Sequence, residues 1–342
     1  MNEYIIDILK SIMSIDSPSG FCKNVTKFLE VEANNLGFKT FYTNKGNLII
    51  EINGEDDNNA IGVCAHVDTL GLMVRSIKAD GTLALTKVGG PIMSTLDGEY
   101  CKVYARNGKV YTGTILSNSP AIHVFKDAST LERTEDTMSV KLDEIVKCKD
   151  DVVKLGIENG DYIAYDSKTV VTETGFIKSR FLDDKLSVAI LFGALKEISL
   201  NSLVLPRKTY FMLSTYEEVG HGMAWIPSDI KEVLAIDMGC IGLDLACTEY
   251  DVSICVKDSS GPYDQDLTNL LVNLAKDLKL SYATDIYPYY GSDVSATLRA
   301  GNDIKGALIG AGVAASHGME RSHISAVENT YKLLIAYLKY KA

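Results

Sequence analysis

Residues 60–65 constrain the fold most strongly, because this short apolar run ends abruptly in His66-Val67-Asp68. A short apolar run between polar segments is typical of a strand that is buried on both faces, as in a parallel sheet covered by helices. In open α/β sheets, ligands bind at the edge where such strands end. The run therefore predicts an α/β fold with a ligand site at its carboxyl end.

Helical and strand patterns alternate on both sides of this run. Apolar residues at helical spacing predict helices at residues 4–13, 23–36, 186–198 and 266–280, and β-type runs predict strands at 48–52, 209–214 and 233–237. Polar residues 53–59 predict a turn. The segment Ser325-Ala326-Val327-Glu328 matches a capping box and predicts the start of a last helix that ends near Tyr340.

The pattern changes between residues 71 and 163. Short β-type runs at 83–85, 100–104 and 109–116 are separated by Gly, Asp and Asn, and regular amphipathic helices are scarce. We therefore predict two domains. Residues 1–70 and 165–342 form an α/β domain, and residues 71–164 form a small β domain inserted into it.

Charge and composition exclude several classes of partner. The formal net charge of -11 repels phosphate groups, so neither nucleic acid nor a membrane is an expected partner. The sequence contains no run of about 18 apolar residues, so we predict no membrane-spanning helix. The first residues lack the basic leader of a secretion signal, and the seven cysteines include no CxxC pair, so we predict a cytoplasmic protein with reduced thiols.

Four segments place carboxylates at the end of a predicted strand or at the start of a predicted helix. They are His66-Val67-Asp68, Asp183-Asp184, Glu217-Glu218 and Asp237. Alternate side chains of a strand point the same way, so Asp68 is a candidate to fix the imidazole of His66. Of two adjacent glutamates, one can bind a metal ion while the other polarises a water. Asp183-Asp184 can either cap a helix or bridge two ions.

Histidines are rare in this chain, and three of the five fall near these acidic segments. They are His66, His317 and His323. Each alone is compatible with a core or surface position. Together with the carboxylates, they resemble the ligand sets that suit Zn²⁺ or Co²⁺.

The order of these segments resembles the cytosolic dinuclear metal aminopeptidases of peptidase family M42. The matching stretches are Pro18-Ser19-Gly20, His66-Val67-Asp68, Leu182-Asp183-Asp184-Lys185, Glu217-Glu218-Val219-Gly220, Asp237 and His323. They span nearly the whole chain in the family's order. The resemblance implies a phosphorylase/hydrolase-like catalytic domain, with a mixed sheet and helices on both faces. It also implies that the insert is a β-barrel or PDZ-like domain for dimerisation or assembly.

The resemblance further implies a ligand set for two divalent metal ions. Zn²⁺ and Co²⁺ are the preferred candidates, and Mn²⁺ is a less preferred one. By this resemblance His66 and Asp237 bind one ion. Glu218 and His323 bind the other, and Asp183 bridges both.

The same resemblance implies an aminopeptidase that removes N-terminal residues from peptides by attack of a water bridging the two ions. Glu217 is then the general base, and Asp68 orients His66. The substrates are peptides, and the subunits form homo-oligomers that range from dimers to dodecamers.

Two alternatives remain open at the level of sequence. One is a metal-dependent deacylase of N-acyl amino acids or peptides on the same scaffold. The other is a non-catalytic oligomer that metal ions stabilise. Glu217 argues against this alternative, because it is a carboxylate beside Glu218 that binds no metal ion in the implied ligand set. The sequence does not specify the preferred N-terminal residue, and the loops at His221 and His317 depart from the family pattern.

Overall fold

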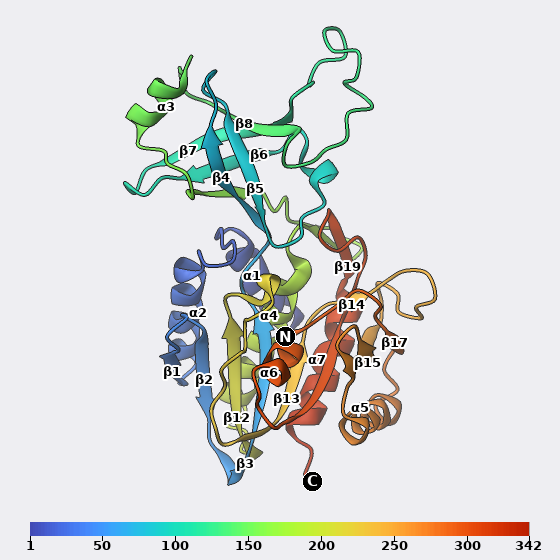
Figure 1. Cartoon of the computed structure of the whole chain (residues 1–342). Helices are drawn as coiled ribbons and strands as arrows, with labels where there is room; N and C mark the ends of the chain where they lie inside the picture. The colour runs from blue at the N-terminus through green and yellow to red at the C-terminus, as the bar shows by residue number, and fades with distance from the viewer. Residues whose placement is uncertain (342) are drawn as a thin grey trace. The chain divides into compact units, whose positions relative to one another are not determined.

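The computed structural model describes residues 1–341, and the chain divides into two compact units (Figure 1). One unit consists of Met1–Asp68 and the chain from Lys168 onward. The other is the uninterrupted stretch Thr69–Ser167. Each unit has its own strands and its own buried core.

The first unit contains a ten-stranded sheet with the order β1-β2-β12-β3-β13-β18-β15-β16, in which β14 also pairs with β18 and β17 with β15. The strands are β1 (Lys39–Tyr42), β2 (Leu48–Ile52), β3 (Gly54–His66), β12 (Leu205–Ser214), β13 (Ile230–Ile236), β14 (Gly239–Cys240), β15 (Val252–Asp258), β16 (Gly261–Pro262), β17 (Tyr282–Ile286) and β18 (Lys305–Val313). The central strands β12, β3, β13 and β18 are parallel, whereas β1–β2, β2–β12 and β15–β18 are antiparallel. The predicted mixed sheet is confirmed.

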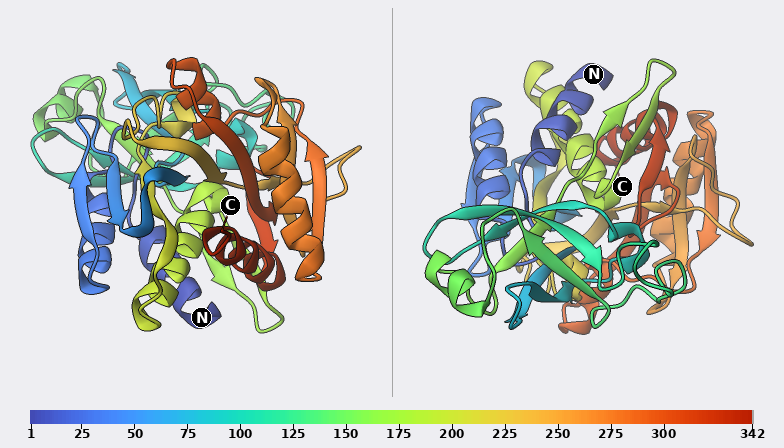
Figure 2. Two further views of the ribbon diagram at one scale, coloured as in Figure 1. Left: turned by 90° about the horizontal axis from the view of Figure 1, so that it is seen from below. Right: turned by 90° about the horizontal axis from the view of Figure 1, so that it is seen from above.

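Helices cover both faces of this sheet, with α6 in front of it in Figure 1 and α4 and α7 behind it (Figures 1 and 2). The helices of this unit are α1 (Asn2–Met13), α2 (Lys23–Asn35), α4 (Leu182–Leu200), α5 (Gln265–Asp277), α6 (Asp293–Arg299) and α7 (Ile324–Leu338). A separate three-stranded sheet consists of β10 (Val170–Val171), β11 (Phe176–Ser179) and β19 (Glu320–His323). The predicted α/β architecture with helices on both faces is therefore confirmed.

α4 fills the core behind the central strands because it is apolar on almost every side. Its residues 188–192 are each 0% exposed, and five consecutive buried residues leave no face of the helix in water. The helix also packs against α1 and α7. Regular helical dihedral angles begin only after Asp184, since Asp183 and Asp184 are both non-helical. The two acids therefore lie on a bend at the start of the helix.

Parallel pairing brings three strand ends to one edge of the sheet. Ser214, the last residue of β12, lies opposite His66, the last residue of β3. β13 pairs with the other side of β3 and ends at Ile236, directly before Asp237. His66, the segment after Ser214, and Asp237 therefore meet at the carboxyl edge of the sheet, where α/β folds place ligand sites.

Two local predictions are wrong. Residues 53–59 do not form a turn, because β3 already begins at Gly54 and its exposed first half pairs with β12. The main-chain hydrogen bonds of the neighbouring strand override the turn preference of these polar residues. The last helix is not capped by Ser325, since its N-cap is His323, whose side chain accepts a hydrogen bond from the backbone N–H of Ser325.

The second unit is a closed barrel with the strand order β4-β5-β8-β7-β6-β9. Its strands are β4 (Gly71–Ile77), β5 (Leu83–Val88), β6 (Tyr100–Tyr104), β7 (Val110–Ser117), β8 (Met138–Leu142) and β9 (Tyr162–Tyr165), accompanied by the 3₁₀ helix η1 (Met93–Leu96) and the helix α3 (Lys149–Leu155). Closure by the pairing of β4 with β9 leaves this barrel without an open edge. The predicted small β-barrel is confirmed.

Among residues 1–341, no helix is long and apolar enough to cross a bilayer.

Gly310 of β18 allows a close approach to the end of β13, because a β-carbon at this position would overlap the carbonyl oxygen of Asp237. We expect Gly310→Ala to lower the free energy of unfolding by about 1–3 kcal/mol, since backbone has to shift to admit the methyl group. Urea unfolding midpoints measure this effect. The matched control is Gly291→Ala, whose β-carbon would have its nearest neighbour at 3.6 Å. Equal midpoints for the two variants would contradict the prediction.

Candidate active site

His66 is held in one tautomer at the end of β3, where it is 1% exposed. Its Nδ1 lies 2.9 Å from the backbone carbonyl oxygen of Asp68. A carbonyl oxygen only accepts, so Nδ1 carries the proton. Its Nε2 lies 3.0 Å from Oδ1 of Asp183. Nε2 therefore faces a carboxylate oxygen, and both atoms are ligand types that divalent metal ions bind.

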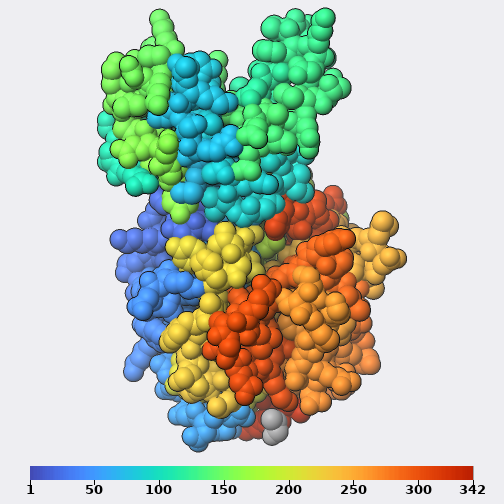
Figure 3. Space-filling model, viewed as in Figure 1, coloured from blue at the N-terminus to red at the C-terminus, as the bar shows by residue number. Residues whose placement is uncertain are grey.

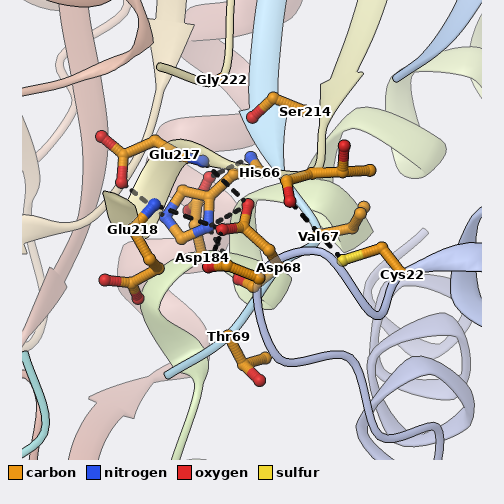
Figure 4. Close-up of polar contacts among 12 residues, drawn as sticks. Cys22, His66, Val67, Asp68, Thr69, Asp184, Ser214, Glu217, Glu218 and Gly222 are labelled. Atoms are coloured by element: carbon orange, nitrogen blue, oxygen red, sulfur yellow. Dashed lines mark hydrogen bonds and ion pairs between the residues drawn. The ribbon is translucent and has the colours of Figure 1, made fainter. Parts of the chain in front are cut away.

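Asp68 acts on the site through both its backbone and its side chain (Figure 4). The sequence predicts that it orients His66, and in the structure its backbone carbonyl contacts the imidazole. Its buried carboxylate instead accepts hydrogen bonds from Oγ of Ser19 at 2.5 Å and from the backbone N–H groups of Glu217 at 3.1 Å and Glu218 at 3.2 Å. Asp68 thus fixes the backbone of the two glutamates.

Glu217 and Glu218 open a single 3₁₀ turn, η2 (Glu217–Val219), which follows the end of β12. The turn ends at Gly220, whose φ of 86° lies in the left-handed region that glycine adopts without strain. Oε2 of Glu217 lies 3.8 Å from Nε2 of His66. Oε1 of Glu218 is buried and has no hydrogen-bond partner in the described chain.

Asp183 and Asp184 face the imidazole from the start of α4. Oδ1 of Asp183 lies 3.0 Å from Nε2 of His66, and its Oδ2 lies 3.6 Å from Nε2 of His317. Oδ2 of Asp184 accepts a hydrogen bond from the backbone N–H of His66 at 3.1 Å, while its Oδ1 is buried without a partner in the described chain. The two oxygens of Asp183 therefore face two different imidazoles.

His317, and not His323, lies at this cluster. Nε2 of His317 is 3.6 Å from both Oδ2 of Asp183 and Oε2 of Glu218. The ring of His323 instead lies between Phe176 and Tyr250, with each ring centroid at 4.9 Å. The structure does not bring His323 to the other predicted ligands.

Burial raises the pKa of several carboxylates at this edge. Burial and the nearby charge of Asp183 raise the pKa of Asp237 to about 7, although His66 opposes the shift. Burial also raises the pKa values of Glu218 and Asp184 well above the usual range of a carboxyl group. Acids this close cannot all be charged unless positive charge lies among them.

The donor set fits divalent metal ions. Two groups of side chains offer ligand atoms within 4.8 Å of one another, namely His66 with Asp184 and Asp237, and His66 with Asp183 and Glu218. The two unpartnered buried oxygens, on Asp184 and Glu218, need a cation or a donor because a buried unpaired carboxylate oxygen is costly. Mixed imidazole and carboxylate ligands suit first-row ions such as Zn²⁺.

Comparison with known families shows which family this chain belongs to. A family model described as M42 glutamyl aminopeptidase matches residues 46–333. The chain belongs to this family. It is therefore a hydrolase that acts on peptide bonds, a metal-dependent aminopeptidase, as the resemblance in the sequence implies.

Similar proteins agree with this membership. The Bacillus subtilis (strain 168) protein named "Putative aminopeptidase YhfE" is 45% identical over 335 residues, which cover 98% of this chain and 97% of that protein. Among solved structures, the TET aminopeptidase of a marine sediment Thaumarchaeota archaeon has a TM-score of 0.88 at 19% identity, covering 98% of this chain and 96% of its own. The Pyrococcus horikoshii TET1 peptidase has a TM-score of 0.86 at 23% identity, covering 98% and 100%. The predicted fold of the M42 family is confirmed.

Two residues at the cluster are missing from the ligand set that the resemblance implied. Asp184 adjoins Asp183 and belongs to one of the two ligand groups. His317 lies six positions before His323, so the sequence offers two imidazoles in one short segment and no local pattern that chooses between them.

The two histidines provide a matched pair of substitutions. We expect His317→Ala to lower the number of Co²⁺ ions bound per chain at equilibrium dialysis, because an imidazole is lost beside Asp183 and Glu218. His323→Ala removes the cap of α7 and is expected to cost about 1 kcal/mol of stability while leaving the bound Co²⁺ unchanged. Loss of Co²⁺ from His323→Ala alone would contradict the placement of these rings.

Proposed function

We propose that this aminopeptidase removes N-terminal residues from peptides with the help of two divalent metal ions. We expect these ions to be Zn²⁺ or Co²⁺ in preference to Mn²⁺. The observation that carries the proposal is the position of Asp183, whose two oxygens face the imidazoles of His66 and His317. A carboxylate is the one side-chain type here that can bind two ions at once. This arrangement supports Asp183 as the bridging ligand.

The remaining ligands divide between the two imidazoles. Asp237 belongs to the same ligand group as His66 and is proposed to share its ion. Glu218 lies 3.6 Å from His317 and is proposed to share the other. His317 therefore takes the role that the family resemblance gave to His323. Each ion keeps few protein ligands, which leaves room for water and substrate.

Glu217 is proposed as the general base. It lies beside the cluster, 3.8 Å from Nε2 of His66, but it belongs to neither of the two ligand groups. Divalent ions bound at this site would supply Lewis acidity to the peptide carbonyl and would bring the pKa of a bound water near neutrality. Asp68 fixes the backbone of Glu217, which supports the proposal that the Glu217 carboxylate accepts a proton from the attacking water.

The surplus of buried carboxylates also supports recognition of a free amine. An N-terminal amine is a cation, and the acids at this edge favour positive charge for the reasons that favour metal ions. An N-acylated substrate carries no such charge. A deacylase on the same scaffold would have no charged substrate amine for these buried carboxylates to bind.

The test is Glu217→Gln, assayed on a panel of aminoacyl and N-acetyl-aminoacyl anilides with Zn²⁺, Co²⁺ or Mn²⁺. We expect kcat on free-amine substrates to fall about 10²–10⁴-fold, because the amide has no basic oxygen to accept the proton. Metal content is expected to match the wild type, since Glu217 is not a ligand in the proposal.

Either of two results would contradict this assignment. Wild-type turnover by Glu217→Gln would exclude Glu217 as the base. Cleavage of the N-acetylated substrates but not of their free-amine counterparts would replace the aminopeptidase by a deacylase.

We further propose that the chain forms homo-oligomers through its inserted unit. The Pyrococcus horikoshii TET1 peptidase assembles into a tetrahedron or a large octahedral shell. In the present chain, the barrel unit carries large apolar side chains in exposed positions, among them Ile122 at 72% and Val124 at 74% exposure. Exposed apolar side chains of this kind are common where proteins associate.

Light scattering tests this proposal. The wild type is expected to have the mass of a dimer or larger assembly, and Ile122→Glu with Val124→Glu is expected to reduce that mass because charge opposes burial. The matched control is Leu200→Glu in the first unit, where Leu200 is 68% exposed. A wild type that is monomeric at every concentration, or an unchanged mass in the double variant, would overturn it.

A further inference from the structure

Glu320 is a buried acid that belongs to neither ligand group. It is 2% exposed and lies at the start of β19. Its Oε2 accepts a hydrogen bond from the backbone N–H of Asp183 at 3.0 Å, and its Oε1 accepts one from the backbone N–H of His317 at 3.0 Å. One carboxylate therefore ties together the backbones of two residues from distant parts of the chain.

The fold brings Glu320 to this position through the three-stranded sheet. β19 pairs with β11, so that Glu320 lies opposite Ser179, shortly before the bend at the start of α4. This pairing places the carboxylate between the two segments whose N–H groups it accepts. The link joins residues 137 positions apart in the case of Asp183.

The segment that carries His317 needs such support. Ala315 has a φ of 58° and His317 a φ of 64°, and side chains other than glycine rarely adopt the left-handed region. A backbone of this kind persists only where its surroundings fix it. The hydrogen bond from the N–H of His317 to Glu320 is one such constraint.

The two links fix the separation of two proposed ligands. Oδ2 of Asp183 and Nε2 of His317 lie 3.6 Å apart, and the carboxylate of Glu320 accepts hydrogen bonds from the backbone N–H groups of both residues. Asp68 makes the same kind of link to the backbones of Glu217 and Glu218.

We infer that Glu320 is a positioning residue of the metal centre, which holds Asp183 and His317 at the spacing at which both bind one ion. The inference rests on the proposed function, since it uses the ligand set given there. Glu320 does not touch the substrate in this role. It acts on metal binding by fixing two ligands before the ion arrives.

The test compares Glu320→Gln with Asp285→Asn. Asp285 is also buried, and its two carboxylate oxygens accept the backbone N–H groups of Ala246 at 2.7 Å and Cys247 at 3.0 Å, away from the ligand groups. In both variants one acceptor oxygen becomes an NH₂ group, which leaves one backbone N–H without its partner. The two variants therefore remove the same kind of link at different places.

Three readouts are taken on the full chain: the Co²⁺ dissociation constant by chelator competition, the absorption spectrum of bound Co²⁺, and the thermal midpoint of the metal-free protein. We expect Glu320→Gln to weaken Co²⁺ binding about 10–100-fold and to change the spectrum. Asp285→Asn is expected to lower the thermal midpoint to a similar extent, with affinity and spectrum unchanged.

A Glu320→Gln protein with wild-type affinity and spectrum would overturn the inference and leave Glu320 a purely structural residue. These readouts do not depend on turnover, so a wild type that binds Co²⁺ but cleaves no peptide defeats the proposed function alone. A wild type that binds no Co²⁺ defeats both.

A measurement on the wild type keeps the inference testable if the variant does not fold. Hydrogen exchange of the metal-free protein reports on residues 181–185 and 315–320. We expect the amides of Asp183 and His317 to be protected before metal is added, because Glu320 already accepts them. Protection that appears only after Co²⁺ is added would overturn the inference, since the ion and not Glu320 would then order the two segments.

Discussion

The candidate active site depends on one electrostatic constraint, the burial of many carboxylates within a few ångströms at one edge of a sheet. Two of these acids, Asp68 and Glu320, are satisfied by backbone N–H groups. Two others, Asp184 and Glu218, keep a buried oxygen without a donor. The protein thus uses peptide groups to stabilise the acids that support the site, and the acids that remain create the demand for cations.

Local patterns in the sequence predict the parts of the site that lie directly after strands. The apolar run before His66 and the strand before Glu217 each identify a strand end, and parallel pairing of those strands then brings the ends together. The α/β architecture and the inserted β unit follow from the same patterns, because hydrophobic periodicity reports burial. These features depend on short stretches of chain, which is why a single sequence reveals them.

The features that the sequence does not reveal depend on contacts between distant segments. His317 reaches the cluster through a backbone with left-handed residues, which the pairing of β19 with β11 supports. Neither the pairing nor the left-handed turn has a local signature in Ser316-His317-Gly318. The polar start of β3 is similar, because Gly54 resembles a turn residue until its pairing with Leu205 is known.

The position of the barrel within the chain has a consequence for the order of folding during synthesis. β3 leaves the ribosome before the barrel, yet both of its neighbours in the sheet, β12 and β13, are made after it. The barrel is contiguous and contains all the pairing partners of its own strands, so it can close first. Until β12 and β13 are synthesised, the apolar second half of β3 has no pairing partner. During this interval the nascent chain exposes an unpaired strand edge, which favours aggregation.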